Sequence, residues 1–312
     1  MSDFVGLKVF APATVANVAV GYDILGFAIN GPGDEIKIGY GKTPGLKIRA
    51  IHGAQNRLPK SIEKNTAGVS AQALLEHLGK TDMAIEIDIY KKMPFASGMG
   101  SSAASAVAGA FAVNEFLGCP LSKRELLPFV LKGEEAADGA YHADNVAPSL
   151  LGGIVLIRNN REHDVIKLPV PHGIYAVVIH PNISVLTADS RDILSDTVSM
   201  DQMIEQSGNL AAFVAGLYRS DLELIRRSLK DVIIEPQRAK LIPHFYDLKE
   251  IAYKNEALGF SISGAGPSLF ALCQNSLIAE SVAINIHAHL KSKGVESQYY
   301  ISEINKEGAV KL

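Results

Sequence analysis

The sequence predicts an α+β protein made of two domains. Strand-like and helix-like segments are mixed along its 312 residues without the regular strand–helix repeat of a doubly wound parallel sheet. A chain of this length is long enough for two ordinary domains, each with a core of its own. The looser stretch 159–172 separates the two halves, so we expect an amino-terminal domain over 1–160 and a carboxy-terminal domain over 161–312.

Periodicity and turn residues predict the elements of the amino-terminal half. A helix is expected over 65–78, with Asn65 as its N-cap and Gly79 as its stop. Another helix runs from about 101 to 117, and a capping-box pattern of Ser122 and Glu125 opens a third that ends near 138. Strands are expected at 7–10, 35–40, 46–51, 84–90 and 152–158.

The carboxy-terminal half also mixes both kinds of element. A strand is expected at 174–180, followed by several helices between 189 and 258. GFSISGAGPSLFALC, at 259–273, is typical of two strands joined by a tight turn. A helix near 278–292 and a last strand near 297–302 complete the predicted fold.

Composition excludes several classes of protein. The net charge of −3 provides no field for nucleic acid or an anionic membrane surface. With Cys119 and Cys273 as its only cysteines, the chain has no disulfide framework or cysteine-based zinc site, which fits a reducing cytosol. The beginning lacks a signal-peptide pattern, and the most apolar stretch, 103–117, is too short for a bilayer. We therefore expect a cytoplasmic protein.

PFASGMGSSAASAVAGAF, at 94–111, places a turn rich in glycine and serine directly before an alanine-rich helix. Small residues of this kind let a helix pack closely against its neighbours. The same arrangement leaves free backbone N–H groups at the positive end of the helix dipole, which is a ready site for phosphate. The stretch therefore has a structural interpretation and a chemical one.

Two known phosphate motifs fit the chain poorly. A P-loop would need a glycine where Ile36 stands before Gly41-Lys42-Thr43, and Pro44 follows, so we interpret 41–43 as a surface hairpin turn. Residues 98–103 do satisfy G-x-G-x-x-[GA], the dinucleotide-binding pattern. However, KKMPFAS separates them from the preceding strand, and no acidic residue ends a second strand about 20 positions on. Dinucleotide binding is therefore the second choice.

Three stretches resemble the GHMP family of small-molecule kinases. PFASGMGSSAA resembles the family motif P-x-x-x-G-[LM]-G-S-S-A, which fixes about seven positions. VFAPATVANVAVGYDILGFAI, at 9–29, is similar to the amino-terminal substrate motif, and SISGAGPSLFAL, at 261–272, to the carboxy-terminal glycine loop. The resemblance spans nearly the whole chain. It implies an ATP-binding α+β domain, a ferredoxin-like α+β domain and an active site between them.

Further stretches resemble the family members that phosphorylate the side-chain hydroxyl of L-homoserine on the route to threonine. These are YHADNVAPSLLGG at 141–153 and IIEPQRAKLIP at 233–243. The resemblance implies ATP with Mg²⁺ and L-homoserine as partners, neither nucleic acid nor membrane, and leaves a homodimer open. A GHMP kinase of another small alcohol and a non-catalytic ligand sensor are the alternatives. The presence of both glycine loops argues against a sensor.

The resemblance assigns Ser102 and Glu134 to Mg²⁺, a hard cation that prefers oxygen ligands. An N-cap role for Ser102 and a solvated helix face for Glu134, as expected of Glu135, stay open as alternatives. Asn65 would lie near adenine, although a simple N-cap explains it equally well. The expected ATP-binding residues are Asn65, Pro94, Ser97, Gly98, Met99, Gly100, Ser101, Ser102, Ala103, Gly264 and Gly266.

Homoserine is a zwitterion, so its pocket needs both signs of charge. Asp23, isolated in an apolar segment, suits the ammonium group. Arg191 and Arg238 suit the carboxylate, because a guanidinium group pairs with it through two hydrogen bonds. An Asx-type turn and surface salt bridges are the structural alternatives for these residues. The weaker candidates for polar lining are Asn17, His142 and Thr187.

Asn145 occupies the position at which other GHMP kinases carry an aspartate, and Asp144 precedes it. An amide cannot accept a proton at neutral pH. The resemblance implies catalysis without a dedicated base, which phosphoryl transfer tolerates because positioning and charge stabilisation dominate it. We expect Asn145 to orient the attacking hydroxyl and, with Ser102 and Glu134, to form the catalytic set. Asp144 as the base is the alternative.

Overall fold

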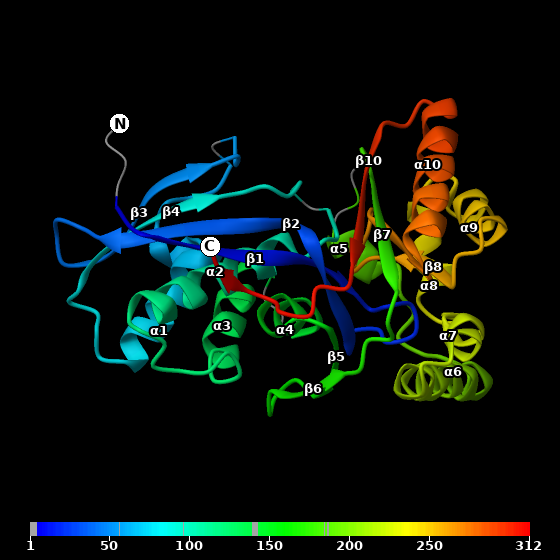
Figure 1. Cartoon of the computed structure of the whole chain (residues 1–312), viewed down its shortest axis with the longest axis horizontal. Coiled ribbons are helices and arrows are strands. Elements are labelled where there is room, and N and C mark those ends of the chain that lie inside the picture. Colours follow the sequence, from blue (N-terminus) through cyan, green and yellow to red (C-terminus); the bar gives the residue numbers. More distant parts are fainter. Residues whose placement is uncertain (1–4, 56, 96, 139–142, 184, 186) are drawn as a thin grey trace.

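Two β-sheets organise the chain in the computed structural model, which describes residues 5–55, 57–95, 97–138, 143–183, 185 and 187–312. Figure 1 shows them at the two ends of an elongated molecule, with the helices of each half grouped around its own sheet. Within these residues, no helix is both long enough and apolar enough to cross a membrane.

The first sheet is built around the 16-residue strand β2, Leu25–Tyr40. Along its length β2 pairs with β1 on one side, and on the other it pairs with β4 near one end and with β5 near the other. Helices α2 (Ser101–Phe116) and α4 (Ala143–Leu151) pack against the sheet, and α1 (Thr66–His77) and α3 (Leu127–Asp138) pack mainly against α2 and each other, as in Figure 1. The other strands are β1 (Leu7–Ala16), β3 (Gly45–His52), β4 (Ala84–Tyr90), β5 (Ile154–Asn159), β6 (Asp164–Leu168) and β11 (Val310–Lys311).

The second sheet is antiparallel, with the strand order β10-β7-β9-β8. That is the order 4-1-3-2 of a ferredoxin-like domain, as predicted. Its strands are β7 (Tyr175–Pro181), β8 (Gly259–Ile262), β9 (Leu269–Cys273) and β10 (Ser297–Glu303). The helices are α5 (Thr187–Asp192), α6 (Met200–Arg219), α7 (Leu222–Ser228), α8 (Glu235–Arg238), α9 (Phe245–Lys254) and α10 (Ser276–Ser292).

Both faces of the second sheet are covered. Apolar side chains of α9 and α10, such as Phe245 and Ile286, form a core of their own against one face. Phe270 of β9 points the other way and meets Phe27 of β2 edge to face, with 5.8 Å between ring centroids. The two halves therefore share an apolar interface, and this interface holds the two glycine loops at a fixed separation.

Helix α2 is the central helix of the first half. All of its side chains from Ala103 to Asn114 are buried, which explains the run of alanines. A Cβ at Gly109 would lie 2.3 Å from the carbonyl oxygen of Ala67, so only glycine permits this approach to α1. The structural interpretation of the stretch 94–111 is thus confirmed, and the chemical one depends on the turn that precedes α2.

Several predicted elements need correction. Residues 41–43 do not form a hairpin, because β4 lies between β2 and β3 in the sheet. Such an insertion between consecutive strands depends on long-range pairing, which local turn signals do not indicate.

The stretch 159–172, expected to separate the two domains, contains β6, which pairs with β5 in the first sheet. Helix α4 was not predicted, since Pro148 lies inside it. The capping-box contacts of Ser122 and Glu125 form, but α3 begins only at Leu127.

Candidate active site

A cavity of about 300 Å³ opens between the two halves of the molecule. It collects most of the side chains that the sequence singled out, and they come from seven separate segments of the chain. Its wall contains Ala16, Asn17, Asp23, Ser97, Gly98, Gly100, Ser101, Ser102, Glu134, Asp144, Asn145, Arg191, Arg238, Gly264 and Ala265. The tertiary structure therefore joins the expected phosphate, metal and substrate residues in one site.

The glycine turn presents the amino end of α2 to this cavity. Gly100 is the N-cap, in the left-handed conformation at φ 66°, and no side chain caps the helix. A Cβ at Gly100 would lie 2.1 Å from the Oγ1 atom of Thr14, so glycine is required for close packing as well. The uncapped N–H groups and the dipole of a 16-residue helix favour an anion at this point.

The carboxy-terminal glycine loop is hydrogen-bonded to that turn. The hydroxyl of Ser263 donates to the carbonyl of Gly98 at 2.6 Å, and the N–H of Ser268 donates to the carbonyl of Ser97 at 3.1 Å. A Cβ at Gly98 would lie 2.5 Å from the carbonyl oxygen of Ser263. The carboxy-terminal glycine loop thus holds the glycine turn before α2 in place through hydrogen bonds.

A second cavity, of about 210 Å³, adjoins the first at Ser101 and Ser102, which line both. Apolar side chains such as Ile89 and Phe95 form part of its wall. Asn65 also lines it and acts as the N-cap of α1, accepting a hydrogen bond from the N–H of Gly68. The N-cap interpretation of Asn65 is therefore confirmed, and its expected place near adenine stays a prediction.

Carboxylates gather on one side of the main cavity. Glu134 and Asp144 are only 4% and 2% exposed, and Asp23 lines the same space. Burial, reinforced by the negative charges of Asp23 and Glu134, raises the pKa of Asp144 to about 7. A group of buried acids at the end of a phosphate site favours a bound cation.

Unsatisfied oxygens in the wall fit a metal ion and a polar ligand. The buried Oγ atoms of Ser97 and Ser102 and the Oδ1 atom of Asp144 have no hydrogen-bond partner within the part of the chain that the structure describes. Leaving such groups unpaired costs about 1–3 kcal/mol each, so a ligand that supplies partners is expected to stabilise the site. Ser102 and Glu134 offer the oxygen donors that Mg²⁺ prefers.

Two guanidinium groups also line the cavity. Arg238 is 4% exposed, and burial lowers its pKa, although arginine remains charged. It donates from Nε to the carbonyl of Ser190 at 2.9 Å and from Nη1 to the carbonyl of Gly264 at 2.9 Å. Its Nη2 atom lies 3.4 Å from the hydroxyl of Tyr22, whose ring it also faces. Arg191 lines the cavity from α5.

Asn17 shapes the loop that presents Asp23. Its side chain donates to the carbonyl of Gly264 at 3.0 Å and accepts from the N–H of Asp23 at 3.0 Å. Asn17, Val18 and Asp23 have left-handed backbone, at φ 69°, 43° and 58°. This conformation is costly for non-glycine residues and is held by the surrounding contacts. The strained loop thus holds the carboxylate of Asp23 in the wall of the cavity that the two arginines also line.

Asn145 lies between the glycine turn and β1. Its Oδ1 atom accepts a hydrogen bond of 2.8 Å from the hydroxyl of Thr14. Asn145 lines the cavity, and within the described residues its Nδ2 hydrogens have no hydrogen-bond partner. Asp144, its neighbour in α4, lines the same wall.

Some predicted site residues lie elsewhere. Met99 and Ala103 are fully buried in the core, and Pro94 and Gly266 line neither cavity. Met99 contributes instead through its backbone carbonyl, which accepts from the N–H of Thr14. Thr187 lies in α5, but its side chain is outside what the structure describes. His142 lies outside the described residues.

Sequence reasoning missed three supporting residues. Tyr22 and Ser190 hold the guanidinium of Arg238, and Lys91 contacts Ser101 at the start of α2. Tyr22 stands directly beside Asp23, and Ser190 directly beside Arg191, so adjacency was the available signal. Lys91 stands ten residues before Ser101, and no local pattern links the two.

Comparison with known proteins places these features in a family. The family models "GHMP kinases N terminal domain" and "GHMP kinases C terminal" match residues 65–153 and 213–292. A homoserine kinase from Chlorobium phaeobacteroides is 43% identical, over 96% of this chain and 97% of its own. The crystal structure of homoserine kinase from Cytophaga hutchinsonii is 46% identical, with a TM-score of 0.96 over 100% and 99% of the two chains. L. major mevalonate kinase shares the fold, at 18% identity and a TM-score of 0.70 over 96% and 97% of the two chains.

Proposed function

Because the chain belongs to the GHMP kinase family, and within it to the homoserine kinases, we propose how its own residues perform that reaction. The activity is transfer of the γ-phosphate of ATP to the side-chain hydroxyl of L-homoserine, with Mg²⁺, to give O-phospho-L-homoserine. One observation carries the assignment of residues: the amino end of α2, the buried carboxylates and the two arginines face one cavity.

The phosphates of ATP are assigned to the turn 97–103, where uncapped N–H groups meet the positive end of α2. The adenosine is assigned to the adjoining cavity lined by Asn65, Ile89 and Phe95. Its apolar wall suits a flat base, and its connection through Ser101 and Ser102 leads directly to the phosphate turn. This places the γ-phosphate toward the main cavity.

Ser102 and Glu134 would hold Mg²⁺, which supplies charge neutralisation at the transferring phosphate when it is bound. The protein contributes preorganised oxygens: the hydroxyl of Ser102, which has no hydrogen-bond partner among the described residues, and the carboxylate of Glu134, which is only 4% exposed. Because the site is already shaped, little reorganisation is needed at the moment of reaction.

Arg191 and Arg238 would bind the α-carboxylate of homoserine, and Asp23 its α-ammonium group. Arg238 suits this role because three of its five N–H donors are fixed by protein groups, which sets the direction of the others. Fixing both charged ends of the amino acid leaves its side-chain hydroxyl free to reach the γ-phosphate. Asn17 positions Asp23, and the polar lining predicted from Thr187 and His142 stays a prediction.

Asn145 would orient the attacking hydroxyl through its free amide hydrogens, without a side-chain base. One observation favours a second assignment, in which Asp144 accepts the proton. Asp144 lines the same cavity, and its pKa of about 7 is suited to a general base near neutral pH. We keep Asn145 as the main assignment because phosphoryl transfer depends mostly on positioning.

The proposal also covers the organisation of the molecule. Residues 1–160 would form the ATP-binding domain and 161–312 the ferredoxin-like domain, with β6 and β11 added to the first sheet. A cytoplasmic location is supported by two cysteines that form no disulfide. A homodimer is supported by the exposed apolar side chains of Met200, Met203 and Ile204 on α6, and light scattering would test it.

A coupled assay of ADP release tests the function directly. The purified protein with MgATP should release ADP when L-homoserine is added, and much less with mevalonate, galactose or L-serine. Phosphorus NMR should then show a phosphate ester on the homoserine side chain. ADP release with another alcohol but not with homoserine would establish a different GHMP kinase, and binding of homoserine without ADP release would establish a sensor.

A further inference from the structure

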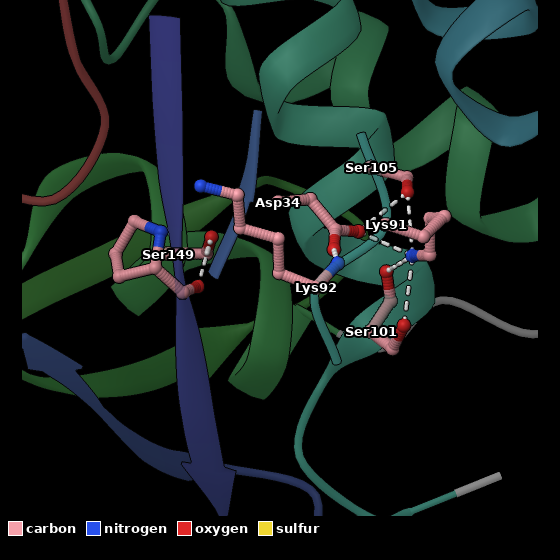
Figure 2. A network of polar contacts seen from close by, with 7 residues as sticks. Asp34, Lys91, Lys92, Ser101, Ser105 and Ser149 are labelled. Carbon is pink, nitrogen blue, oxygen red and sulfur yellow. Dashed lines mark hydrogen bonds and ion pairs between the residues drawn. The ribbon is translucent and has the colours of Figure 1, made fainter. Parts of the chain in front are cut away.

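Lys91 is buried behind the phosphate turn at the end of β4. Its ammonium group donates to the carbonyl of Ser101 at 2.8 Å, to the hydroxyl of Ser101 at 2.7 Å and to the hydroxyl of Ser105 at 2.8 Å. It is also ion-paired with Asp34 of β2. Figure 2 shows these contacts converging on the Nζ atom. One lysine thus joins two strands of the sheet to the first turn of α2.

The environment of Lys91 leaves it no capacity for a nucleotide. An ammonium group has three hydrogens, and four acceptor atoms already surround this one. The side chains of Lys91 and Asp34 are 3% and 0% exposed, so the charge is neutralised within the protein. Asp34 accepts further hydrogen bonds from the hydroxyl of Ser105 and the N–H of Lys92. A lysine beside a phosphate turn is usually expected to bind phosphate, but all three hydrogens of this ammonium group are already used by acceptors within the protein.

We propose that the Lys91–Asp34 pair is a positioning element that holds the first turn of α2 in its phosphate-binding geometry. Ser101, which Lys91 holds through both its carbonyl and its hydroxyl, lies between Gly100 and Ser102 and lines both cavities. The proposal rests on the assignment of the phosphates to this turn. Lys91 acts through Ser101 rather than on ATP, so it affects nucleotide binding without contacting the nucleotide.

The sign of one substitution separates positioning from direct binding. If Lys91 bound phosphate, Asp34→Asn would remove a competing negative charge and tighten the binding of MgADP. If the pair positions α2, the same substitution loosens the turn and weakens MgADP binding, by about 10-fold if one charge-assisted hydrogen bond is lost. Isothermal titration with MgADP measures the change. Unchanged or tighter binding would overturn the proposal.

A second variant guards against misfolding, because a buried charge left alone can unfold a protein. Lys91→Met with Asp34→Leu removes both charges together, a change that is often tolerated. The double variant should bind MgADP more weakly than wild type and raise the KM for ATP by a similar factor, with the KM for homoserine within about two-fold of wild type. Lys92→Met is the matched control, since Lys92 is exposed and pairs with Glu35; it should bind like wild type.

The proposed function and the positioning role of Lys91 can be contradicted separately. Absence of homoserine-dependent ADP release by the wild-type enzyme would contradict the proposed function. An active wild type whose double variant binds MgADP normally would contradict only the positioning role. A double variant in which both KM values rise equally would indicate a general structural role and would also overturn it.

A separate cluster of possible metal ligands lies on the second half, apart from both cavities. His244 and Asp247 stand at the start of α9, and His289 lies in the last turn of α10. One ligand atom from each lies within 4.8 Å of the others. The Oδ2 atom of Asp247 is 3.4 Å from Nδ1 of His244 and 3.7 Å from Nε2 of His289.

These separations suit a shared cation better than hydrogen bonds. Both distances exceed the 2.7–3.2 Å of an N–H···O bond. Ligands at about 2.1 Å around a tetrahedral Zn²⁺ are about 3.4 Å apart, close to the observed values. The buried Nε2 atom of His289 also has no hydrogen-bond partner among the residues that the structure describes.

We infer that His244, Asp247 and His289 form a binding site for a borderline divalent cation such as Zn²⁺. Two imidazole nitrogens and one carboxylate favour Zn²⁺ over Mg²⁺, which prefers oxygen ligands only. Such an ion would connect the start of α9 to the end of α10, on the side of the second sheet away from the active site. Its expected effect is therefore on stability rather than on phosphoryl transfer.

Titration of the metal-free protein with ZnCl₂ tests this site. We expect one Zn²⁺ per chain, a higher midpoint of thermal unfolding, and at least about 10-fold weaker binding after His289→Ala. His287→Ala, on the same helix and bonded to Ser297, is the control and should bind like wild type. Kinase activity in MgATP should be unchanged by His289→Ala. If Zn²⁺ does not bind stoichiometrically, or if His289→Ala and His287→Ala weaken its binding equally, the proposed metal site is wrong. The three side chains would then only contact one another.

Discussion

The Nη1 atom of Arg238 donates a 2.9 Å hydrogen bond to the carbonyl of Gly264, so the group assigned to the substrate carboxylate is fixed to the carboxy-terminal glycine loop. Asn17 donates to that same carbonyl at 3.0 Å and accepts from the N–H of Asp23. One backbone carbonyl therefore sets the distance between the two charges that would bind the zwitterion. In the proposed assignment, this spacing would favour an amino acid over an uncharged alcohol.

Arg238→Ala or Arg191→Ala should lower kcat/KM for homoserine by about 30-fold or more. Removing one partner of a desolvated, hydrogen-bonded charge pair costs about 2–5 kcal/mol. The KM for homoserine should carry much of the loss, and the KM for ATP should stay nearly constant. Steady-state kinetics with each substrate varied would measure both.

The control for the arginines is a substrate without the carboxylate, 3-aminopropanol. Wild type should phosphorylate it poorly, and the arginine variants should be scarcely worse than wild type on it. Equal losses on both alcohols would show that the arginines serve phosphate binding or structure instead.

Ser102→Ala and Glu134→Gln should mainly lower kcat. Loss of a metal ligand at a phosphoryl-transfer site commonly costs several kcal/mol of transition-state stabilisation. Glu135→Gln, on the exposed neighbouring position of α3, is the matched control and should behave like wild type. Comparison of kcat at saturating MgATP would check this, and wild-type kcat in a folded Glu134→Gln protein would refute the metal assignment.

Asp144→Asn should retain most activity, whereas Asn145→Ala should lose much of it through misplacement of the hydroxyl. The hydrogen bond from Thr14 holds the side chain of Asn145 in place, and Asn145→Ala removes both this contact and the amide group from the wall of the cavity. A loss of about 10²–10⁴-fold in kcat for Asp144→Asn would instead identify Asp144 as the base. The pH profile of kcat would then lose an ionisation near neutral pH.

Asp144 should also make stability depend on pH in the nucleotide-free, metal-free protein. Its pKa is raised from 3.8 to about 7 in the folded state, so the folded protein binds this proton more tightly than the unfolded chain does. The free energy of unfolding should therefore fall as pH rises from about 4 to about 7, by on the order of 4 kcal/mol from this group. Asp144→Asn should flatten that dependence and be more stable than wild type at pH 8. Urea denaturation at pH 5 and pH 8 measures it, and parallel curves for the two proteins would contradict the buried, protonated carboxyl.

The sequence by itself determined the family, the α+β class, the helix that follows the glycine turn and most of the residues that line the main cavity. It could do so because these features are local: a glycine turn before an alanine run specifies an uncapped helix end, and Asn65 before α1 specifies a cap. Charged residues isolated in apolar segments, such as Asp23, indicated the substrate site for the same reason.

Only the tertiary structure decided how those pieces meet. The insertion of β4 between β2 and β3, and the pairing of β6 with β5, depend on contacts between distant segments that no local pattern records. The contact of Lys91 with Asp34, 57 residues away, likewise joins two distant segments, and it directs the ammonium group to a partner inside the protein. The raised pKa of Asp144 likewise arises from burial beside Asp23 and Glu134, which are far apart in the sequence. Burial and neighbouring charges exist only in the folded chain, so the pKa of Asp144 is set only when the chain folds.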